Sequence, residues 1–361
     1  MRLRTGLRVL WRAPGEVQIG TDARWAVRLT DLTRHEIDLL TALLDGATLR
    51  GLTASARSLG MPPARLDALV TLLDRAQLTM PDSGPRRSQP TVVQLPPGTG
   101  PDAATWTRLL ADSDGAALIA ARGDRTVGLL GAGRLGLSMA VTLASAGVGS
   151  VLVEDDQPVS HADLGVGGYT TRDLGAPRRA AAARVLSNVA PGVRTTAPGE
   201  TRPDVMVLVE HGAADALRAR VLMSAGVPHL SVVVREADVV VGPMVLPGVS
   251  ACLRCLDLHR TDADEHWPAV AAQLAGAPGS TSTSVGEESV LAAIGGSLAA
   301  GQVLAQLDGT PPRTLGAALE VALPEAVPRL REWPVHPRCG CTRLPGTLVS
   351  VPRREHPAHD R

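Results

Sequence analysis

Polar and apolar residues alternate in two short stretches near the start of the chain, Glu16 to Gly20 and Arg24 to Thr30. Turn residues at 20–22 separate the stretches, so the pattern predicts two paired β-strands. Three apolar patterns with helical spacing follow, over 33–44, 49–59 and 62–78. Thr33 or Asp31 can cap the first helix, which would end at Asp45-Gly46, and Pro62-Pro63 begins the third. Strands followed by three helices predict a winged-helix-like module over residues 1–80.

The next segment has a different composition. Residues 81–101 are rich in proline, serine and glycine, which is typical of a linker. Residues 105–121 fit one short helix. We therefore expect a linker with a short helix over residues 81–125.

A βαβ pattern begins at Thr126. Residues 127–130 form an apolar run, a glycine loop follows at Gly131, Gly133 and Gly136, and residues 137–146 read as an alanine-rich helix. A second apolar run, 151–153, ends in Glu154. Glycines in this context let backbone amides approach a phosphate, and an acid after the second strand can bind ribose hydroxyls. The pattern predicts a Rossmann-type α/β domain, for which a nicotinamide dehydrogenase is the default expectation.

The region after residue 282 supplies one more element. A polar stretch precedes Val290, Leu291, Ile294 and Leu298, whose spacing predicts a long packing helix, and Gly295-Gly296 would allow close approach of another helix. We expect the α/β domain to span 126–344. Residues 345–361 show no periodicity and predict an extended or mobile tail.

Composition excludes several classes of protein. The 361 residues are 44% hydrophobic and carry no formal net charge, which disfavours disorder, a membrane surface and bulk nucleic-acid binding. Lysine and phenylalanine are absent, a bias that also makes arginine a weak functional marker. We identify neither a signal peptide nor an uncharged apolar run of about 18 residues, so a cytoplasmic location is expected.

The four cysteines form two close pairs, Cys252 with Cys255 and Cys339 with Cys341. In a reducing compartment this spacing favours metal binding over disulfides. Four thiolates would form a closed tetrahedral site for a structural zinc ion. Three histidines near the cysteines in sequence are spare ligand candidates: His259, His266 and His336.

The segment 151–193 resembles the ThiF/MoeB-like adenylyltransferases, the family that contains ubiquitin-activating enzymes. Asp156, Asp173-Leu-Gly-Ala-Pro177 and Asn188-Val-Ala-Pro191 fall in register with that family's motifs, and the cysteines occupy the places of its zinc ligands. The resemblance covers about 126–342.

Departures from the family pattern concern the groups that act on ATP. The family's lysine is Arg178 here, its arginine falls at Gly165, its asparagine at Ala162, and its Mg-ATP aspartate near His211. Arginine does not reproduce lysine's geometry, and nothing nearby replaces the aspartate as a magnesium ligand. We expect a pseudoenzyme that does not use ATP. Its vestigial nucleotide-binding residues would be Gly131, Gly133, Gly136, Glu154 and Arg178, which hold a nucleotide weakly or only shape the fold.

The phrases 252–268 and 336–341 resemble the leader-peptide-binding partners of YcaO cyclodehydratases, which work in thiazole- and oxazole-modified peptide biosynthesis. The resemblance implies a scaffold that binds a precursor's leader and presents its core to a separate YcaO enzyme. Strand addition needs a sheet edge and a groove. The candidate peptide-binding residues are Trp25, Val27, Leu29, Arg65, Leu69 and Arg75. The resemblance also makes a homodimer plausible.

Two other functions remain open. An active ThiF-like adenylyltransferase could use Arg178 and acids such as Asp156 to rebuild the ATP site. A regulator could bind DNA through the winged helix and a nucleotide through the Rossmann domain. Acids such as Asp38 and Asp67 lie among the arginines of the N-terminal helices and disfavour a DNA-binding face, so no nucleic acid is expected as a partner.

Overall fold

The computed structural model describes residues 2–3, 7–23, 26–44, 49–76, 78–80, 94–110, 114–197, 201–274 and 286–342. The chain forms two compact units, residues 1–123 and 124–361. The second unit therefore begins two residues before the expected boundary at 126. The predicted tail at 345–361 and the predicted helix end at Asp45-Gly46 lie outside the described residues.

The first unit contains a three-stranded antiparallel sheet in the order β2 (Val9–Ala13), β3 (Glu16–Ile19), β4 (Val27–Leu29). A separate pair joins β1 (Arg2–Leu3) to β5 (Thr79–Met80). The sequence pattern missed β2, where Arg12 pairs with Glu16 across the turn at 2.7 Å. Within the described residues, β4 pairs with β3 alone and forms one edge of the sheet.

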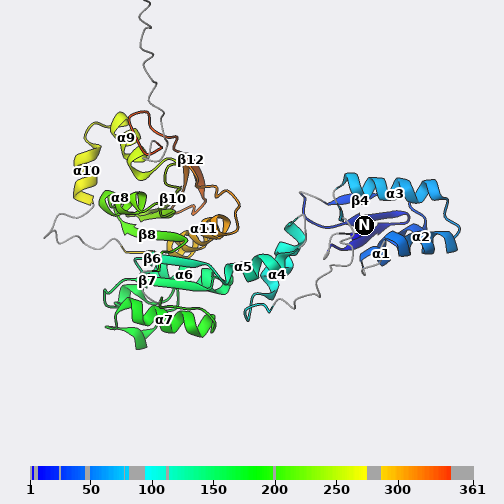
Figure 1. The fold of residues 1–361 in the computed structure, drawn as a ribbon, viewed down its shortest axis with the longest axis horizontal. Helices are drawn as coiled ribbons and strands as arrows, with labels where there is room; N and C mark the ends of the chain where they lie inside the picture. Colours follow the sequence, from blue (N-terminus) through cyan, green and yellow to red (C-terminus); the bar gives the residue numbers. More distant parts are fainter. Residues whose placement is uncertain are drawn as a thin grey trace, which may run out of the picture. The chain divides into compact units, whose positions relative to one another are not determined.

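Three helices follow the sheet: α1 (Arg34–Leu44), α2 (Leu49–Ser58) and α3 (Pro63–Arg75) (Figure 1). Thr33 and Glu36 cap α1 reciprocally, because the Glu36 carboxylate accepts from the Thr33 amide while the Glu36 amide donates to the Thr33 hydroxyl. Leu40 and Leu73 pack on Val17, Ile19 and Leu29 of the sheet to form a core. The structure thus contains the three predicted helices, and β3 and β4 correspond to the two predicted strands.

The short helix predicted over 105–121 is two helices, α4 (Gly100–Leu109) and α5 (Gly115–Arg122). Asp114 begins the second, because its side chain accepts a hydrogen bond from the Ala117 amide. Gly115 allows the two helices to pack closely, since a Cβ there would lie 2.2 Å from the Ala103 carbonyl oxygen. The apolar pattern alone did not reveal this break.

The second unit contains a seven-stranded sheet in the order β12-β11-β10-β9-β8-β6-β7. Strands β7, β6, β8 and β9 run parallel, and β10, β11 and β12 are antiparallel to their neighbours. The strand bounds are β6 Thr126–Leu130, β7 Ser150–Glu154, β8 Val205–His211, β9 His229–Val234, β10 Asp238–Val245, β11 Ala317–Ala322 and β12 Arg329–Glu332. This mixed α/β arrangement is the expected Rossmann-type fold.

Six α-helices of this unit are described: α6 Arg134–Ser145, α7 Arg178–Val189, α8 Ala216–Ser224, α9 Leu253–Ala263, α10 Trp267–Leu274 and α11 Ser289–Leu307. Two 3₁₀ turns, His161–Asp163 and Thr171–Asp173, lie between β7 and α7. Earlier in the chain, the glycine loop and helix α6 follow β6 directly, as the sequence predicted.

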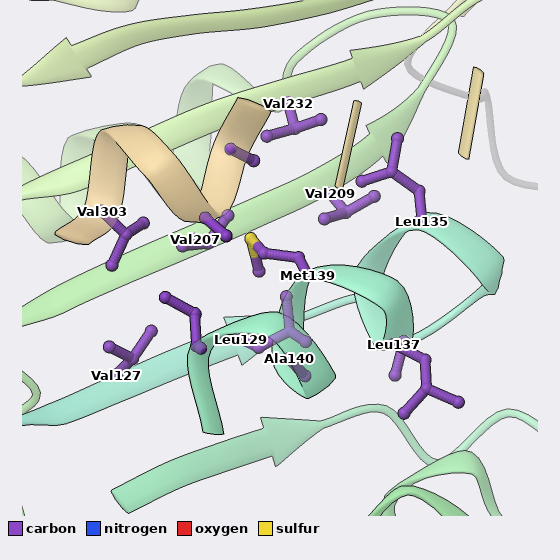
Figure 2. Close-up of a cluster of buried hydrophobic side chains, with 14 of the residues drawn as sticks. Val127, Leu129, Leu135, Leu137, Met139, Ala140, Val207, Val209, Val232 and Val303 are labelled. Carbon is purple, nitrogen blue, oxygen red and sulfur yellow. The ribbon is translucent and has the colours of Figure 1, made fainter. Parts of the chain in front are cut away.

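The main core lies where α6 and α11 pack against the sheet (Figure 2). Figure 2 shows Leu129 and Val207 from neighbouring strands, Met139 from α6 and Val303 from α11. Gly296 brings α11 against α6, since a Cβ there would lie 3.0 Å from the Leu135 carbonyl oxygen. The predicted close approach at this glycine pair is confirmed.

Helix α11 corrects one expectation about membranes. Its 19 residues carry no charged side chain, and an 18-residue window within it has a mean hydropathy of 1.6, so it is long and apolar enough to span a bilayer. The expectation overlooked this run because serines, glycines and glutamines interrupt it. In the structure α11 contributes Leu291, Ala299 and Val303 to the core, and this packing accounts for its apolar composition.

Candidate functional site: an acidic glycine-loop cleft and a four-cysteine cluster

The glycine loop connects β6 to α6. Gly131 has φ +89°, and a Cβ there would lie 2.5 Å from the Val209 carbonyl oxygen. At Gly136 a Cβ would lie 2.0 Å from the Gly131 carbonyl oxygen. These two glycines are therefore required by the turn and by helix packing. Gly133 differs, because a Cβ there would meet the Glu287 carboxylate, 2.6 Å from its Oε1.

Arg178, at the first position of α7, is held by two carboxylates. Its guanidinium lies 3.2 Å from Asp155 Oδ2 and 2.7 Å from Asp163 Oδ1. Asp155 also accepts a hydrogen bond of 2.8 Å from the Ala132 amide of the glycine loop. Burial lowers the pKa of Arg178, but the hydrogen bond and charge of Asp163, together with Asp155, outweigh it and raise the pKa above its ordinary value. The cation at the family's lysine position is thus neutralised within the chain.

Two capping boxes fix the turns that carry these acids. Asp163 accepts from the amide and hydroxyl of Ser160, and Asp173 does the same with Thr170. Arg184 of α7 lies 2.6 Å from Asp173. Asp173, which the family motif picked out, therefore orders the backbone before α7.

Glu287, immediately before the residue that caps α11, reaches the start of α6. Its carboxylate accepts a hydrogen bond of 2.6 Å from the Leu135 amide and lies 3.0 Å from His211 Nε2. Only 7% of its side chain is exposed. His211 ends β8, so it lies at the cleft where the sequence placed it.

These groups line a cleft of about 400 Å³ at the carboxyl ends of β6, β7 and β8. The cleft is lined by Leu130, Gly131, Gly133, Glu154, Asp155, Asp156, Gln157, Arg178, Val209, His211, Arg218 and Glu287. Four acids thus face two arginines. Arg218 is itself paired, 3.3 Å from Glu210, so both cations are already engaged. Of the predicted nucleotide residues, Gly131, Gly133, Glu154 and Arg178 line the cleft, whereas Gly136 packs against the loop backbone at Gly131.

All four cysteines meet between the start of α9 and residues 339–341 (Cys252, Cys255, Cys339 and Cys341). Their Sγ atoms lie within 4.8 Å of one another and are buried. Individual Sγ–Sγ distances are 3.4, 3.7 and 4.0 Å. Four sulfurs around Zn²⁺ at about 2.3 Å form a tetrahedron with edges of about 3.8 Å. The cluster therefore fits a zinc tetrathiolate.

Electrostatics in the cluster also favour a cation. Burial raises the pKa of Cys252 to about 11 and also raises the pKa of Cys341, since thiolates lack solvation there. Burial opposes ionisation of Cys255 too, but backbone hydrogen bonds from His336 and Cys252 help to lower its pKa overall. A metal ion would supply the charge that keeps the other thiols deprotonated.

The three candidate histidine ligands contact other groups. His336 Nε2 lies 2.8 Å from Asp262 Oδ2, and its Nδ1 accepts from the Arg338 amide. His259 Nε2 lies 2.9 Å from the Pro334 carbonyl oxygen. His266 is exposed beside Glu265. These hydrogen bonds support the loop around residues 334–338, and the possible metal group within the described residues contains the four cysteines without these histidines.

The first unit places the predicted peptide-binding residues unevenly. Leu29 and Leu69 are buried in its core, so their side chains are not available to a groove. Val27 also packs on that core. Arg65 is exposed at its guanidinium but bonds to Glu36 at 2.6 Å, and Arg75 is exposed. Trp25 lies outside the described residues.

Sequence reasoning missed the acids that control the cleft. Asp155 and Asp163 flank Asp156, which the family register selected but which is exposed and pairs with Arg179. Glu287 lies 152 residues from its partner Leu135. The register alone could not find these contacts, although the unusual density of acids around 154–163 was a signal for the first two.

A model of the ThiF family matches residues 120–341. Among solved structures, E. coli MccB bound to ATP matches with a TM-score of 0.67 at 13% identity, over 94% of this chain and 98% of MccB. MccB in complex with N-formylated MccA gives 0.67 and 13%, over 94% and 99%. PaaA gives 0.63 at 17% identity, over 91% and 98%. Among curated proteins, none matches.

Proposed function

The chain belongs to the ThiF family, and we propose that it is a non-catalytic member that binds the leader of a ribosomally made precursor peptide. It would act in the cytoplasm and present the core of that peptide to a separate YcaO-type cyclodehydratase for azoline formation. Solved structures of MccB, which share this fold, include one in complex with N-formylated MccA and one with ATP. Coverage of 94% reaches beyond residues 124–361 into the first unit.

One observation carries the non-catalytic assignment: the only arginines that line the described cleft are already neutralised. Arg178 is bound by Asp155 and Asp163, and Arg218 by Glu210. A triphosphate would have to enter beside four carboxylates without a free cation. Stabilising the developing charge in adenylyl transfer needs donors that are available to the phosphates. This arrangement therefore favours a scaffold over an adenylating enzyme.

The edge strand β4 is the proposed docking site for the leader. An added strand would bond to the free edge of β4, while side-chain pockets would set its register. Helix α3 offers a matching surface, because Arg65, Ala68, Leu72 and Arg75 recur at helical spacing and are all exposed. Leu72, 44% exposed, replaces the buried Leu69 as the apolar contact of this surface.

This surface begins close to the end of β4. Arg65 donates a hydrogen bond of 2.8 Å to the carbonyl oxygen of Asp31, two residues after β4 ends. A groove of about 450 Å³ lies at the same place, lined by Asp31, Thr33, His35, Glu36, Leu59, Gly60, Met61, Pro62 and Arg65. An extended peptide on β4 would therefore have a hollow for one of its side chains at this end.

The cysteine cluster would hold a structural Zn²⁺ that stabilises the second unit. Four thiolates satisfy the ion and leave no position for a substrate. The ion would tie the start of α9 to the segment at 339–341. A homodimer and a docking surface for the YcaO enzyme are further parts of the proposal.

Peptide capture is tested by proline substitutions in β4, read by fluorescence polarisation with a labelled precursor peptide as the probe. Successive strand amides point to opposite edges, so one of Val27→Pro and Arg28→Pro removes an outward donor. We expect that variant to lose at least tenfold in affinity while circular dichroism stays unchanged. Leu10→Pro and Trp11→Pro on β2, the opposite edge, are matched controls. Equal affinity across all four folded variants would move the leader site elsewhere.

An ATP-dependent enzyme is the second candidate, because the glycine loop, Glu154 and a cleft of about 400 Å³ are all present. The ThiF family and the MccB structure with ATP support a peptide-acting adenylyltransferase of this fold. Pyrophosphate exchange that depends on Mg²⁺ and on the precursor would establish this candidate. We expect no exchange above the level of a protein-free control.

A further inference from the structure

Glu287 lies where the glycine loop would place a phosphate. The first amides of an α-helix have no intrahelical partner, and they attract anions together with the helix dipole. In this chain the Leu135 amide, in the first turn of α6, donates to the Glu287 carboxylate at 2.6 Å. A side-chain anion thus takes one of the donors that such loops offer to phosphates.

The space beside Gly133 gives a second, independent observation. The middle glycine of such a loop lacks a side chain so that a phosphate can approach the backbone. Here a Cβ added to Gly133 would lie 2.6 Å from Glu287 Oε1 and 2.9 Å from Oε2. The carboxylate therefore fills the room that this glycine leaves.

Neighbouring contacts hold Glu287 in this position. His211 Nε2 lies 3.0 Å from Oε1, whereas the Leu135 amide bonds to Oε2. Arg134 contacts the Glu287 carbonyl oxygen at 3.2 Å and the Ser289 hydroxyl at 3.1 Å. Glu288 caps α11 by accepting from the amides of the second and third helical residues. The residues on both sides of Glu287 are thus fixed by their own contacts, and its side chain is buried.

We propose that Glu287 is a built-in carboxylate ligand of the glycine loop, which occupies the phosphate subsite and excludes nucleoside phosphates and pyrophosphate. Two effects act together, since the carboxylate fills the subsite and its charge repels a second anion. Acids from β7 and the following turn, Glu154, Asp155 and Asp156, add to this repulsion from the other wall. The inference deepens the proposed non-catalytic function and rests on it, because it names the group that keeps phosphate out.

The test is calorimetric titration of the full chain with inorganic pyrophosphate and, separately, with Mg-ATP. Glu287→Ala removes both bulk and charge, whereas Glu287→Gln keeps the shape and removes the charge alone. We expect wild type to bind neither probe at about 1 mM, Glu287→Ala to bind pyrophosphate at least tenfold more tightly, and Glu287→Gln to show a smaller gain. Glu265→Gln, a carboxylate change at an exposed position outside the cleft, should behave as wild type.

Two results would overturn the inference. One is saturable binding of either probe to wild type below about 1 mM. The other is that wild type, the Glu287→Gln variant and the Glu287→Ala variant all fail to bind either probe. Thermal unfolding must then show that at least the Glu287→Gln variant is folded. Leader binding is measured on other residues, in the first unit. If the Glu287 titration fails, the proposal of peptide capture is unaffected. If peptide capture fails, the proposal for Glu287 is still decided by the titration.

Discussion

The cysteine cluster and the glycine-loop cleft belong to the same unit, yet they differ in how their polar groups are satisfied. In the cluster, four buried sulfurs converge and contact mainly one another. In the cleft, the Ala132 amide, the Leu135 amide and Arg178 are each bonded to a carboxylate of the chain. Buried polar groups need partners. The cluster could therefore hold a cation, whereas the cleft has supplied its own anions.

The largest expected effect concerns the cluster. Replacing Cys252 and Cys255 together by serine should abolish zinc binding and lower stability by at least about 4 kcal/mol, because an ion bound at about 1,000 times its Kd contributes that much. Metal analysis of the purified protein and its thermal unfolding curve measure both effects.

A strong chelator provides the control for this double variant. Chelation should bring the wild-type unfolding temperature down to that of the variant, and it should leave the variant unchanged. A variant that keeps one equivalent of zinc would show that the four sulfurs are not the ligands. In that case the contrast between cluster and cleft would no longer hold.

The sequence separation between contacting residues explains how well each of these two regions could be predicted. The cysteines of each pair are only two or three residues apart, so their spacing alone predicted the cluster. The cleft depends on contacts across 15, 23 and 152 residues. The family register selected Arg178 and His211, which both line the cleft, but it could not show which carboxylates would meet them. Glycine spacing likewise predicted the loop, while its occupant comes from the far side of the fold.

A second prediction sharpens the view that the cleft is internally neutralised. Asp163→Asn removes one of the two charges that hold Arg178 and weakens a capping box, so we expect a loss of about 2 kcal/mol. Asp156→Asn is the matched control, because the Asp156 side chain is 76% exposed and its pair with Arg179 should contribute less than about 0.5 kcal/mol. Urea unfolding of both variants measures the difference. Equal losses would mean that the Arg178 pairs are no stronger than a surface pair.

The N-terminal unit shows a different limit of prediction. Strands β3 and β4 and helices α1 to α3 were predicted because periodicity and capping residues such as Thr33 are local signals, whereas β2 was missed. The buried face of α3 could not be predicted, because Leu69 and Leu72 are both apolar and lie three residues apart. Only the sheet decides that Leu69 faces the core and Leu72 faces solvent. The same reasoning explains why Arg65 proved to be a partner of Glu36 as well as a surface cation.

The smallest expected effect tests whether packing of α11 on α6 keeps Glu287 at the glycine loop. A Cβ at Gly296 would lie within 3.1 Å of three atoms of α6, two of them backbone, so Gly296→Ala should overpack the crossing. Overpacking costs about 1–3 kcal/mol and helix propensity returns up to about 1, which leaves a net loss of about 1 kcal/mol. Gly301→Ala lies on the same helix with no atom within 4 Å of the added Cβ, so it should gain about 0.5–1 kcal/mol. Thermal unfolding of the two variants measures whether each substitution lowers or raises stability. If Gly296→Ala also tightens pyrophosphate binding while Gly301→Ala does not, displacement of α11 has withdrawn Glu287 from the loop. Occupation of the glycine loop by a carboxylate of the chain, which distinguishes the cleft from the cluster, then depends on the contact between α11 and α6.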